Sequence, residues 1–496
     1  MKTNLLNFKT VIFYVTILFI ANNLLSQEVS TDIKLNTTDY YDVAMDGGHC
    51  IAVDGDNVYA IWQGMLSENE SYIYFTKSTD GGETFSTEVP IYSGPTEAYH
   101  VMSSIDVANN NIYIAWVAAT NDANDWNIWF IKSTDGGTTF STPTPITTNN
   151  SSAFPILKAH GSNVYIFFAN AGTYPMVDYY FIKSIDNGDT WGSASQINDG
   201  TCISEVMFSN LNTMEKDAAG NIYLAWTDGR NEDANGDIYF CKSTDGGDTF
   251  FGNVMVNDMT ILDSDSVQHY PSIAVGSDNN VLVNFIDYRL GSDDWANARP
   301  YIANSNDGGT SFAQEQLFSG IEGYCGHAVL ASNSSQNIAY AACANLDMHF
   351  GVFLFISDDN GATYGEHIPI SDEFDVDPKD IHAQMDEYNQ VHIVWKDCRV
   401  EVDNSDIYYS KYNPTPMSIN NTSKDKIKFY PNPANDIIEF SNFNKNSIVE
   451  IYSVNGKLVF SQKINCKLDI SEIPAGMYFI KILGEEKPIT KKLIKL

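Results

Sequence analysis

The stretch KSTDGGETF at residues 77–85 is the part of the sequence that decides the fold. It lies between YIYFT and FSTEVPIY, two segments whose residues follow the period-2 pattern of β-strands. An Asp at this place accepts hydrogen bonds from the amides of its own turn, Gly adopts a positive φ, and the aromatic residue packs back into the sheet. We therefore interpret the stretch as a turn between two neighbouring strands.

The turn recurs five more times, and every copy fits the pattern SxDxGx[ST][FWY]. The further copies are KSTDGGTTF (132–140), KSIDNGDTW (183–191), KSTDGGDTF (242–250), NSNDGGTSF (304–312) and ISDDNGATY (356–364). Their aspartates are Asp80, Asp135, Asp186, Asp245, Asp307 and Asp359, which lie 55, 51, 59, 62 and 52 residues apart. This period is typical of a β-propeller blade and too long for most solenoids. We expect these six aspartates to be structural.

Seven similar segments mark the second strand of each repeat, so the sequence predicts an all-β, seven-bladed propeller with four-stranded antiparallel blades. The segments are NVYAIW (57–62), NIYIAW (111–116), NVYIFF (163–168), NIYLAW (221–226), NVLVNF (280–285), NIAYAA (337–342) and QVHIVW (390–395). The seventh repeat has DIYYSKY (406–412) but no turn motif after it, whereas VSTDIKLN (29–36) copies the outer-strand pattern. We expect the N-terminal strand to complete the seventh blade and close the ring.

The six turns resemble the Asp-box, or BNR repeat, of the sialidase-like β-propeller superfamily. The resemblance implies a secreted or cell-surface protein that processes extracellular polysaccharide, of the glycoside hydrolase type. Sialidases of this family use three arginines that clamp a carboxylate, one of them in an RIP-like motif of the first blade, with a Tyr/Glu nucleophile and an Asp acid/base. This chain has no arginine before Arg230 and no RIP motif, so we do not expect true sialidase activity.

The N-terminus has the layout of a secretory signal peptide, which we place at residues 1–26. Two lysines precede an apolar run at 11–20, and the small Ser26 follows. Ten apolar residues are too few to span a bilayer, and we predict no transmembrane segment elsewhere. The propeller is then expected over residues 27–412.

The C-terminus is expected to hold a linker and a second domain. The linker, 413–426, is polar and contains two prolines, and the domain, 427–496, is rich in strands and predicted to be a small β-sandwich. Its YPNP start, its VNG turn, its PAGMYFIKI strand and its basic last residues resemble the C-terminal sorting domain of type IX secretion cargo. The resemblance implies contact with that secretion machinery, export across the outer membrane, and then release or surface attachment.

Charge is divided unevenly along the chain. Residues 424–496 hold 12 Lys and 8 Asp/Glu and the signal holds two Lys, so residues 28–423 keep 28 − 12 − 2 = 14 basic against 63 − 8 = 55 acidic groups, a net charge of −41. Such a body repels nucleic acid and anionic membranes.

The odd count of seven cysteines in 496 residues favours buried free thiols over a disulfide framework. We expect a monomer.

Three repeats end their second strand alike, with an aromatic residue, then Asp, then Arg at every second position: Trp226, Asp228 and Arg230; Phe285, Asp287 and Arg289; Trp395, Asp397 and Arg399. Together with Arg299 these are all the arginines of the chain. The repetition favours an Asp/Arg tie that holds the adjacent loop. The alternative is that Arg230, Arg289 and Arg399 are catalytic and bind a substrate carboxylate.

Histidines occur at matching places at the start of three first strands: His49, His327 and His382. They fall in repeats that become neighbours once the ring closes, so one of them is a candidate base, and the three are candidate Zn²⁺ ligands. The alternative is that each packs singly between blades. Further candidates for substrate binding on the same rim are His100, His269, His349 and Arg299. The acidic loops NEDANGDIY and EVDNSDIY are candidates for Ca²⁺ or are simply solvated.

Three function classes remain open on this sequence. A glycoside hydrolase needs two carboxylates across a sugar. A uronate polysaccharide lyase needs a His or Tyr base and an Arg that neutralises the carboxylate. A non-catalytic propeller that binds glycan or protein needs neither. In each case we expect the repeated turns on one face of the ring and the His and Arg residues on the other.

Overall fold

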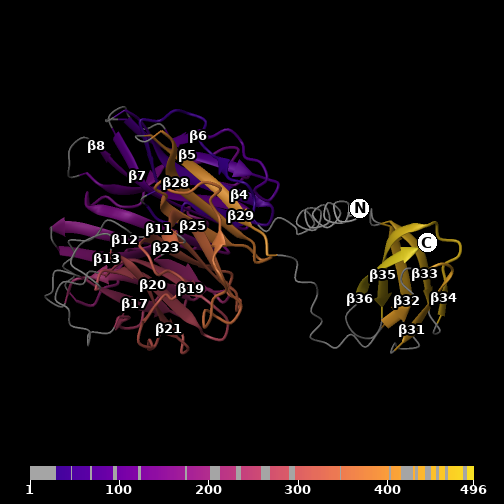
Figure 1. Cartoon of the computed structure of the whole chain (residues 1–496). Helices are drawn as coiled ribbons and strands as arrows, with labels where there is room; N and C mark the ends of the chain where they lie inside the picture. The colour runs from indigo at the N-terminus through magenta and orange to yellow at the C-terminus, as the bar shows by residue number, and fades with distance from the viewer. Residues whose placement is uncertain are drawn as a thin grey trace, which may run out of the picture. The chain divides into compact units, whose positions relative to one another are not determined.

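The computed structural model divides the chain into two compact units, residues 1–414 and 415–496 (Figure 1). It describes residues 29–45, 47–67, 70–92, 98–120, 125–173, 176–200, 213–230, 236–257, 268–289, 297–346, 348–401, 404–414, 428–430, 434–441, 448–453, 457–463, 467–483 and 489–495. Every named element in these residues is a β-strand, which confirms the all-β class. A search of them finds no helix with the length and apolar character needed to cross a bilayer. The predicted signal peptide and most of the predicted linker lie outside the described residues.

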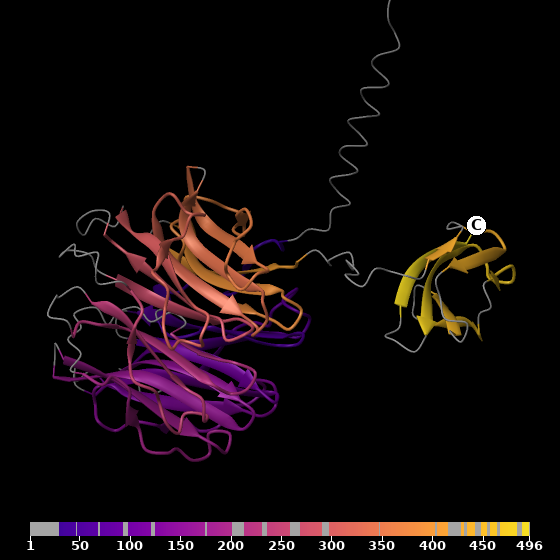
Figure 2. The same ribbon diagram turned by 90° about the horizontal axis from the view of Figure 1, so that it is seen from below.

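The first unit contains seven antiparallel sheets, numbered here in chain order (Figure 2). Sheet 1 has β2 (Asp42–Ala44), β3 (Ile51–Asp54), β4 (Asn57–Ser67), β5 (Glu70–Ser78) and β6 (Val89–Tyr92). Sheet 2 has β7 (Ala98–Ala108), β8 (Asn111–Thr120), β9 (Asn127–Ser133) and β10 (Thr144–Pro145). Sheet 3 has β11 (Ser152–His160), β12 (Asn163–Thr173), β13 (Met176–Ser184) and β14 (Ser195–Gln196). Sheet 4 has β15 (Met214–Lys216), β16 (Ile222–Asp228), β17 (Asp237–Ser243) and β18 (Val254–Met255).

The remaining sheets of this unit repeat the same order of strands. Sheet 5 has β19 (Gln268–Val275), β20 (Val281–Asp287), β21 (Arg299–Ser305) and β22 (Gln316–Leu317). Sheet 6 has β23 (Cys325–Ser332), β24 (Ile338–Leu346), β25 (His349–Ser357) and β26 (Ile368–Pro369). Sheet 7 has β27 (Lys379–Met385), β28 (Val391–Glu401), β29 (Asn404–Tyr412) and β1 (Ile33–Lys34).

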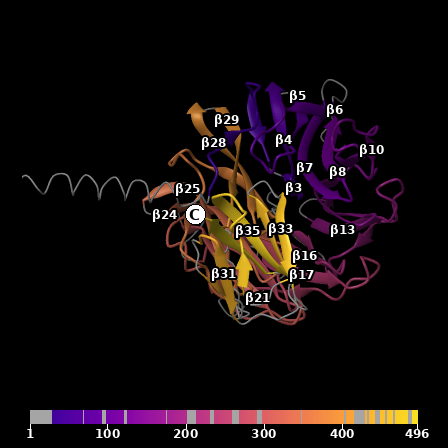
Figure 3. The same ribbon diagram turned by 90° about the vertical axis from the view of Figure 1, so that its right-hand side faces the viewer.

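The inner strands of successive sheets contact one another in a closed cycle. β3 contacts β7, and the contacts then run through β11, β15, β19, β23 and β27 back to β3. Figure 3 shows the sheet of β28 and β29 beside the sheet of β4 and β5, where the end of this unit meets its beginning. The sheets therefore enclose a common axis.

The N-terminal strand closes this cycle, as the sequence predicts. Ile33 of β1 pairs with Tyr409 of β29 in antiparallel register. The Ser30 amide donates to the Lys411 carbonyl at 2.9 Å, which extends the ladder beyond β1. The last sheet thus receives its outer strand from the start of the described chain, and its edge is covered.

Each repeated turn is held by its own Ser and Asp side chains. In sheet 4, Ser243 Oγ donates to Asp245 Oδ1 at 2.7 Å and accepts from the Gly247 amide at 2.8 Å. Thr249 Oγ1 donates to Asp245 Oδ2 at 2.6 Å. The other five turns repeat these bonds within 0.1 Å, so the six aspartates have the structural environment that the sequence predicts.

The turns also join each sheet to its neighbour, which the sequence does not reveal. The aromatic residue of the sheet 4 turn, Phe250, packs edge-on against Phe181 of sheet 3 at 4.9 Å. Lys242 Nζ, just before the turn, donates to the Gly308 carbonyl in the turn of sheet 5 at 2.6 Å. Equivalent lysines in sheets 1, 2, 3 and 7 make the same bond. Because the turn overhangs the gap between sheets, its side chains reach across it.

The second unit contains two further antiparallel sheets. One has β30 (Lys428–Tyr430), β31 (Ile437–Ser441) and β34 (Lys467–Asp469), and the other has β32 (Ile448–Ser453), β33 (Leu458–Lys463), β35 (Gly476–Leu483) and β36 (Ile489–Lys495). Ile438 and Leu468 from the first sheet share one apolar cluster with Val449, Ile451 and Ile480 from the second. The two sheets therefore have a common core.

Candidate functional site

The repeated turns occupy one end of the strands in the first unit. The Gly81 amide of the first turn donates to the carbonyl of Asp56, which lies in the turn between β3 and β4, and the Gly308 amide donates likewise to Asn279. The turns from first to second strands therefore share this face with the repeated turns. The starts of the inner strands and the ends of the second strands lie at the opposite face, where most of the predicted His and Arg residues are found.

At that opposite face the starts of β19, β23 and β27 bring together a group that we call the rim cluster: Tyr270, Tyr324, His327, Lys379 and Asp380. The rings of Tyr270 and His327 lie 4.9 Å apart and are tilted by 33°. Both side chains are partly exposed. The cluster therefore joins residues of three neighbouring sheets at a solvent-accessible surface.

The tautomer of His327 is set by the neighbouring sheet. The Asp380 amide donates to His327 Nδ1 at 3.1 Å. Burial lowers the pKa of His327, against the opposing effect of the Asp380 carboxylate. The imidazole is therefore neutral near pH 7 with its proton on Nε2, because Nδ1 must accept. His327 presents an N–H donor, not a cation.

Backbone strain occurs in the same place. Tyr270 has φ +55° and Asp380 has φ +49°, and each sits at an irregularity in the pairing of its inner strand with the next strand. Met102 and Phe154 occupy comparable irregularities in sheets 2 and 3, with φ +56° and +54°. A left-handed conformation costs a non-glycine residue about 1–3 kcal/mol and is concentrated at functional sites. The bulges turn side chains toward the rim.

The three repeated arginines do not form a free carboxylate clamp. Arg289 Nε donates to Asp287 Oδ2 at 2.8 Å, its Nη2 pairs with Glu315 at 2.9 Å, and its guanidinium lies 4.2 Å above the Tyr301 ring. All these partners belong to sheet 5: Asp287 lies in β20, Tyr301 lies in β21, and Glu315 directly precedes β22. The arginine therefore holds three strands of one sheet together.

Arg230 and Arg399 have the same arrangement in sheets 4 and 7. Arg230 pairs with Asp228 and Asp199 and covers Tyr239 at 4.1 Å. Arg399 pairs with Asp397 at 2.6 Å and with Asp32 of the N-terminal segment at 2.7 Å, and it covers Tyr408 at 3.8 Å. Each guanidinium is already bound by two carboxylates, an arrangement that favours the tie over the clamp.

His49 and His382 do not occupy matching places, contrary to the sequence interpretation. Ile51 pairs with Ala60, and Ala383 pairs with Ile393. Ala60 and Ile393 are each the fourth residue of their second-strand segment, so Ile51 and Ala383 occupy equivalent positions. His382 is therefore equivalent to Cys50, which is one residue beyond His49. The alternation of a strand sends neighbouring residues to opposite sides. His49 Nε2 donates to the Ala383 carbonyl at 3.1 Å, and His382 Nε2 donates to the Met45 carbonyl at 2.9 Å.

These two histidines lock sheets 7 and 1 together and are neutral. Burial lowers the pKa of His49 well below its usual value and that of His382 to about 4. The two rings and His327 do not gather into a metal-binding group, and the described residues contain no cluster of three His, Cys, Asp or Glu poised for a metal. The predicted Zn²⁺ site is therefore not formed by these histidines. Of the two acidic loops considered for Ca²⁺, residues 231–235 of the first and 402–403 of the second lie outside the described residues.

The other predicted binding residues are spread over three sheets. His100 in sheet 2 is buried and accepts from Trp116 Nε1 at 3.0 Å. His269 packs against Tyr288, and burial lowers the pKa of its imidazole to about 4. His349 is exposed and lies 3.2 Å from Asp375. Arg299 lies in sheet 5 and donates to the Ala298 carbonyl at 2.9 Å.

The cysteines with described side chains are free thiols. Cys50, Cys241, Cys325, Cys343 and Cys398 form no disulfide. Burial raises the pKa of Cys325, Cys343 and Cys241. They behave as small apolar core residues, as the count and spacing in the sequence favour.

Sequence reasoning missed Tyr270, Tyr324, Lys379 and Asp380. One signal was present for Tyr270: it precedes Pro271 in an inner strand, as Phe154 precedes Pro155. A proline inside a strand pattern marks a bulge. The others come together only through the contact of sheets 5, 6 and 7, which no local pattern encodes.

Comparison with known proteins gives a family for the C-terminus and a fold for the remainder. Residues 428–496 match the family described as Secretion system C-terminal sorting domain. No curated protein matches the chain. Among solved structures, the chain is similar to an ulvan lyase, a polysaccharide lyase, at 12% identity over 76% of this chain and 96% of that one, with a TM-score of 0.53.

Two further solved structures are similar to this chain with lower TM-scores. The polysaccharide lyase Uly1 shares 10% identity over 78% of this chain and 98% of its own, with a TM-score of 0.51. A Hadza microbial sialidase shares 16% identity over 61% of this chain and 63% of its own, with a TM-score of 0.43. The ulvan lyase and Uly1 show the fold of the first unit. The match at the C-terminus shows that the chain carries a sorting domain for type IX export to the cell surface or the extracellular space.

Proposed function

We propose that this chain is an exported polysaccharide lyase that cleaves a uronate-containing extracellular polysaccharide at the rim cluster. The observation that carries the proposal is the pair of Tyr270 and a neutral His327, both partly exposed, near Lys379 at the face opposite the repeated turns. The fold likeness to two polysaccharide lyases supports the same chemistry. Glycoside hydrolysis, the first expectation from the sequence, has less support because no pair of carboxylates faces across this rim in the contacts described.

The proposed architecture follows the sequence interpretation. A signal peptide at 1–26 precedes a seven-bladed propeller at 27–412, a linker at 413–426 and a β-sandwich sorting domain at 427–496. Seven sheets in a closed cycle of inner-strand contacts support the count of blades. Two sheets around one apolar cluster support the sandwich. We retain the expectation of a monomer.

The proposed reaction is a β-elimination at a uronate residue. Tyr270 acts as its phenolate, whose oxygen removes the proton next to the carboxylate. The electron pair of that C–H bond forms a carbon–carbon double bond, and the bond to the leaving glycosidic oxygen breaks. Tyr270 then returns the proton to that oxygen. The Nε2–H of His327 and the ammonium group of Lys379 stabilise the negative charge on the carboxylate as the enolate forms.

The arginines have a different role in this proposal from the one that the sequence alternative gives them. Neutralisation of a substrate carboxylate needs a donor that is not already paired with two carboxylates of the protein. Arg230, Arg289 and Arg399 do not meet that condition. Lys379 pairs with the exposed Asp377 at 2.6 Å, an ion pair that a substrate carboxylate can replace at little cost because it is solvated.

The test is product analysis with the mature protein on ulvan, alginate and pectate. The proposal expects products with the ultraviolet absorbance of an unsaturated uronate, produced by the wild type and lost in Tyr270→Phe. New reducing ends without that absorbance would show a glycoside hydrolase instead. Saturable binding without any cleavage would show a non-catalytic glycan-binding propeller. Either result would overturn the lyase proposal.

A further inference from the structure

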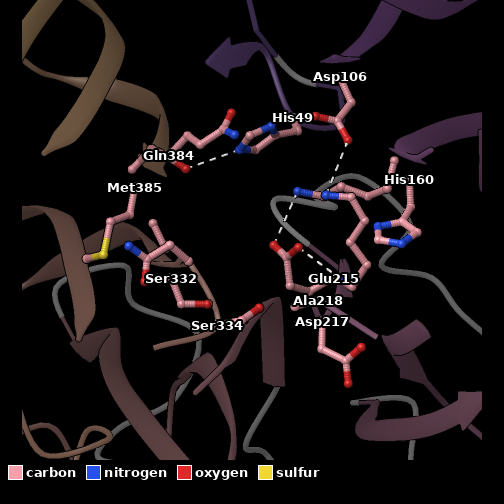
Figure 4. Close-up of a pocket in the computed structure, with 15 residues that line it drawn as sticks. His49, Asp106, His160, Glu215, Asp217, Ala218, Ser332, Ser334, Gln384 and Met385 are labelled. Carbon is pink, nitrogen blue, oxygen red and sulfur yellow. Dashed lines mark hydrogen bonds and ion pairs between the residues drawn. The ribbon is translucent and has the colours of Figure 1, made fainter. Parts of the chain in front are cut away.

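A cavity of about 250 Å³ lies on the axis of the first unit, enclosed by the inner strands (Figure 4). Its lining comes from β7, β11, β15, β23 and β27 and from His49, just before β3. None of the rim cluster lines it. Its open side is formed by residues at the ends of inner strands, such as His160 and Ser332, where these strands turn toward the second strands. The cavity is therefore separate from the proposed catalytic rim.

The charged groups in this cavity nearly cancel. Lys158 Nζ lies 3.3 Å from Glu215 Oε2, and Lys216 Nζ lies 3.9 Å from Asp106 Oδ2. Desolvation lowers the pKa of Lys216, but the Asp106 and Glu215 carboxylates outweigh it, so the net shift is upward and the ammonium stays charged. Asp217 also lines the cavity, but its carboxylate accepts hydrogen bonds from Ala219, Asn221 and Tyr223, so two cations face two carboxylates. An anion gains no net attraction here.

Two acceptor atoms of the lining lack donors. His49 is 2% exposed and gives its only ring proton to Ala383, so its Nδ1 is an acceptor, and no described residue donates to it. Gln384 Oε1 is likewise buried without a partner among the described residues. A buried acceptor without a donor costs about 1–3 kcal/mol, so a molecule that supplies donors is stabilised at this place.

We propose that the axial cavity binds a small neutral polyhydroxylated molecule, a monosaccharide. Each sugar hydroxyl both donates and accepts, which suits a lining that offers ammonium donors beside carboxylate, imidazole and amide acceptors. A cation gains no net attraction either, because the two ammonium groups balance the two carboxylates that they pair with. The cavity is much larger than the roughly 10–15 Å³ that one water needs, and smaller than most of the roughly 300–1,000 Å³ pockets that hold drug-sized ligands.

The proposal is tested by ligand-observed NMR titration of the mature protein with D-xylose and D-glucuronate as probes. We expect saturable binding of D-xylose. D-glucuronate should displace the bound xylose only at concentrations at least threefold higher than those at which xylose binds, and glucuronate that binds at the rim causes no displacement. Gln384→Leu should weaken xylose binding at least tenfold. Gln316→Leu, the same change on the exposed strand β22, should leave it unchanged, and so should Tyr270→Phe, which separates this site from the rim.

Thermal unfolding first establishes that each variant is folded. Should Gln384→Leu fail to fold, Ala331→Val narrows the cavity from another lining position and should also weaken xylose binding. The proposal is overturned if no saturable xylose binding occurs, if glucuronate displaces xylose from the cavity more readily than xylose itself binds, or if the folded cavity variants bind as the wild type does. A cavity that holds only water gives the first of these results, whether or not the protein cleaves polysaccharide.

Discussion

The repeated turns and the rim cluster stand at opposite ends of the same strands, and they are built in opposite ways. In the turns, one set of hydrogen bonds recurs six times, and each positive φ but that of Asn187 and Asn360 falls on glycine. At the rim, the strand irregularity with a positive φ recurs at Met102, Phe154, Tyr270 and Asp380, but the side chains at it differ from sheet to sheet. The shared hydrogen bonds therefore mark the part that holds the sheets together, and the varied side chains mark the part available for chemistry.

The largest expected effect is on catalysis at the rim. Tyr270→Phe removes the proposed proton-transferring oxygen, so the rate of cleavage should fall by about 10²–10⁴-fold, with the free energy of unfolding unchanged. Polysaccharide cleavage and urea unfolding are measured on the same preparation. Tyr388→Phe is the matched control, because Tyr388 is exposed in the turn between β27 and β28. Equal rates for wild type and Tyr270→Phe would remove Tyr270 from the mechanism.

Arg289→Met should instead act on stability. It leaves Asp287 and Glu315 buried without their cation, and breaking a buried ion pair in this way costs about 3–5 kcal/mol. Urea unfolding measures this loss, and kcat of the molecules that remain folded should equal that of the wild type. A loss of kcat with normal stability would show that Arg289 acts in catalysis and would contradict the assignment of a purely structural role to it.

Two neighbouring glycines of one repeated turn separate backbone strain from steric clash. Gly136 and Gly137 have φ +66° and +76°, but a Cβ on Gly136 meets open space, whereas one on Gly137 lies 2.6 Å from the Phe75 ring of sheet 1. Gly136→Ala should cost about 1–2 kcal/mol, and Gly137→Ala about 1–3 kcal/mol more. Denaturant midpoints measure both. Equal losses would show that the turn does not press on the preceding sheet.

The smallest effect is a dependence of stability on pH at the junction of sheets 7 and 1. Burial lowers the pKa of His382 to about 4, below the roughly 6.5 of the unfolded chain. As the pH falls from 6.5 to 4, the unfolded state takes up a proton that the folded state does not, so stability decreases over this range. His382→Gln should flatten the slope of unfolding free energy against pH, and His349→Gln, at an exposed position, should not.

A second pH effect belongs to the repeated turns. Hydrogen bonds from Ser, Thr and backbone donors hold the pKa of Asp186 at about 2, and those of Asp80, Asp135, Asp245, Asp307 and Asp359 are also lowered. The stability that these carboxylates contribute is present above about pH 4 and is lost as the pH falls below it. Unfolding below pH 4 should therefore be steeper than the histidine effect alone produces.

The sequence predicts the strands, the turns and the closing of the cycle because each depends on local chemistry. The pattern around Asp245 specifies its turn without reference to any other sheet, and VSTDIKLN resembles an outer strand wherever it stands. The contact of Phe250 with Phe181 is not predictable in this way, because the turn and its partner lie in different repeats.

The candidate site was predictable only in part. His327 stands out in the sequence, but its tautomer depends on the Asp380 amide and its neighbour is Tyr270, 57 residues earlier. The arginines stand out more strongly in the sequence, but carboxylates already occupy their guanidinium groups. This could not be predicted, because the partners Asp199, Glu315 and Asp32 are distant in sequence from the repeated motif. The prediction that His49 and His382 occupy equivalent positions was wrong, because it aligned the two strands on their histidines and not on their pairing with the second strands.

The most direct measurement compares Tyr270→Phe with Ser243→Ala for both cleavage rate and free energy of unfolding. Ser243 holds a repeated turn and is fully buried, so its loss should cost about 1–3 kcal/mol with the rate of folded molecules unchanged, while Tyr270→Phe loses rate and keeps stability. The opposite assignment, with rate lost in Ser243→Ala and stability lost in Tyr270→Phe, would contradict the separation of structure and chemistry between the two ends of the strands.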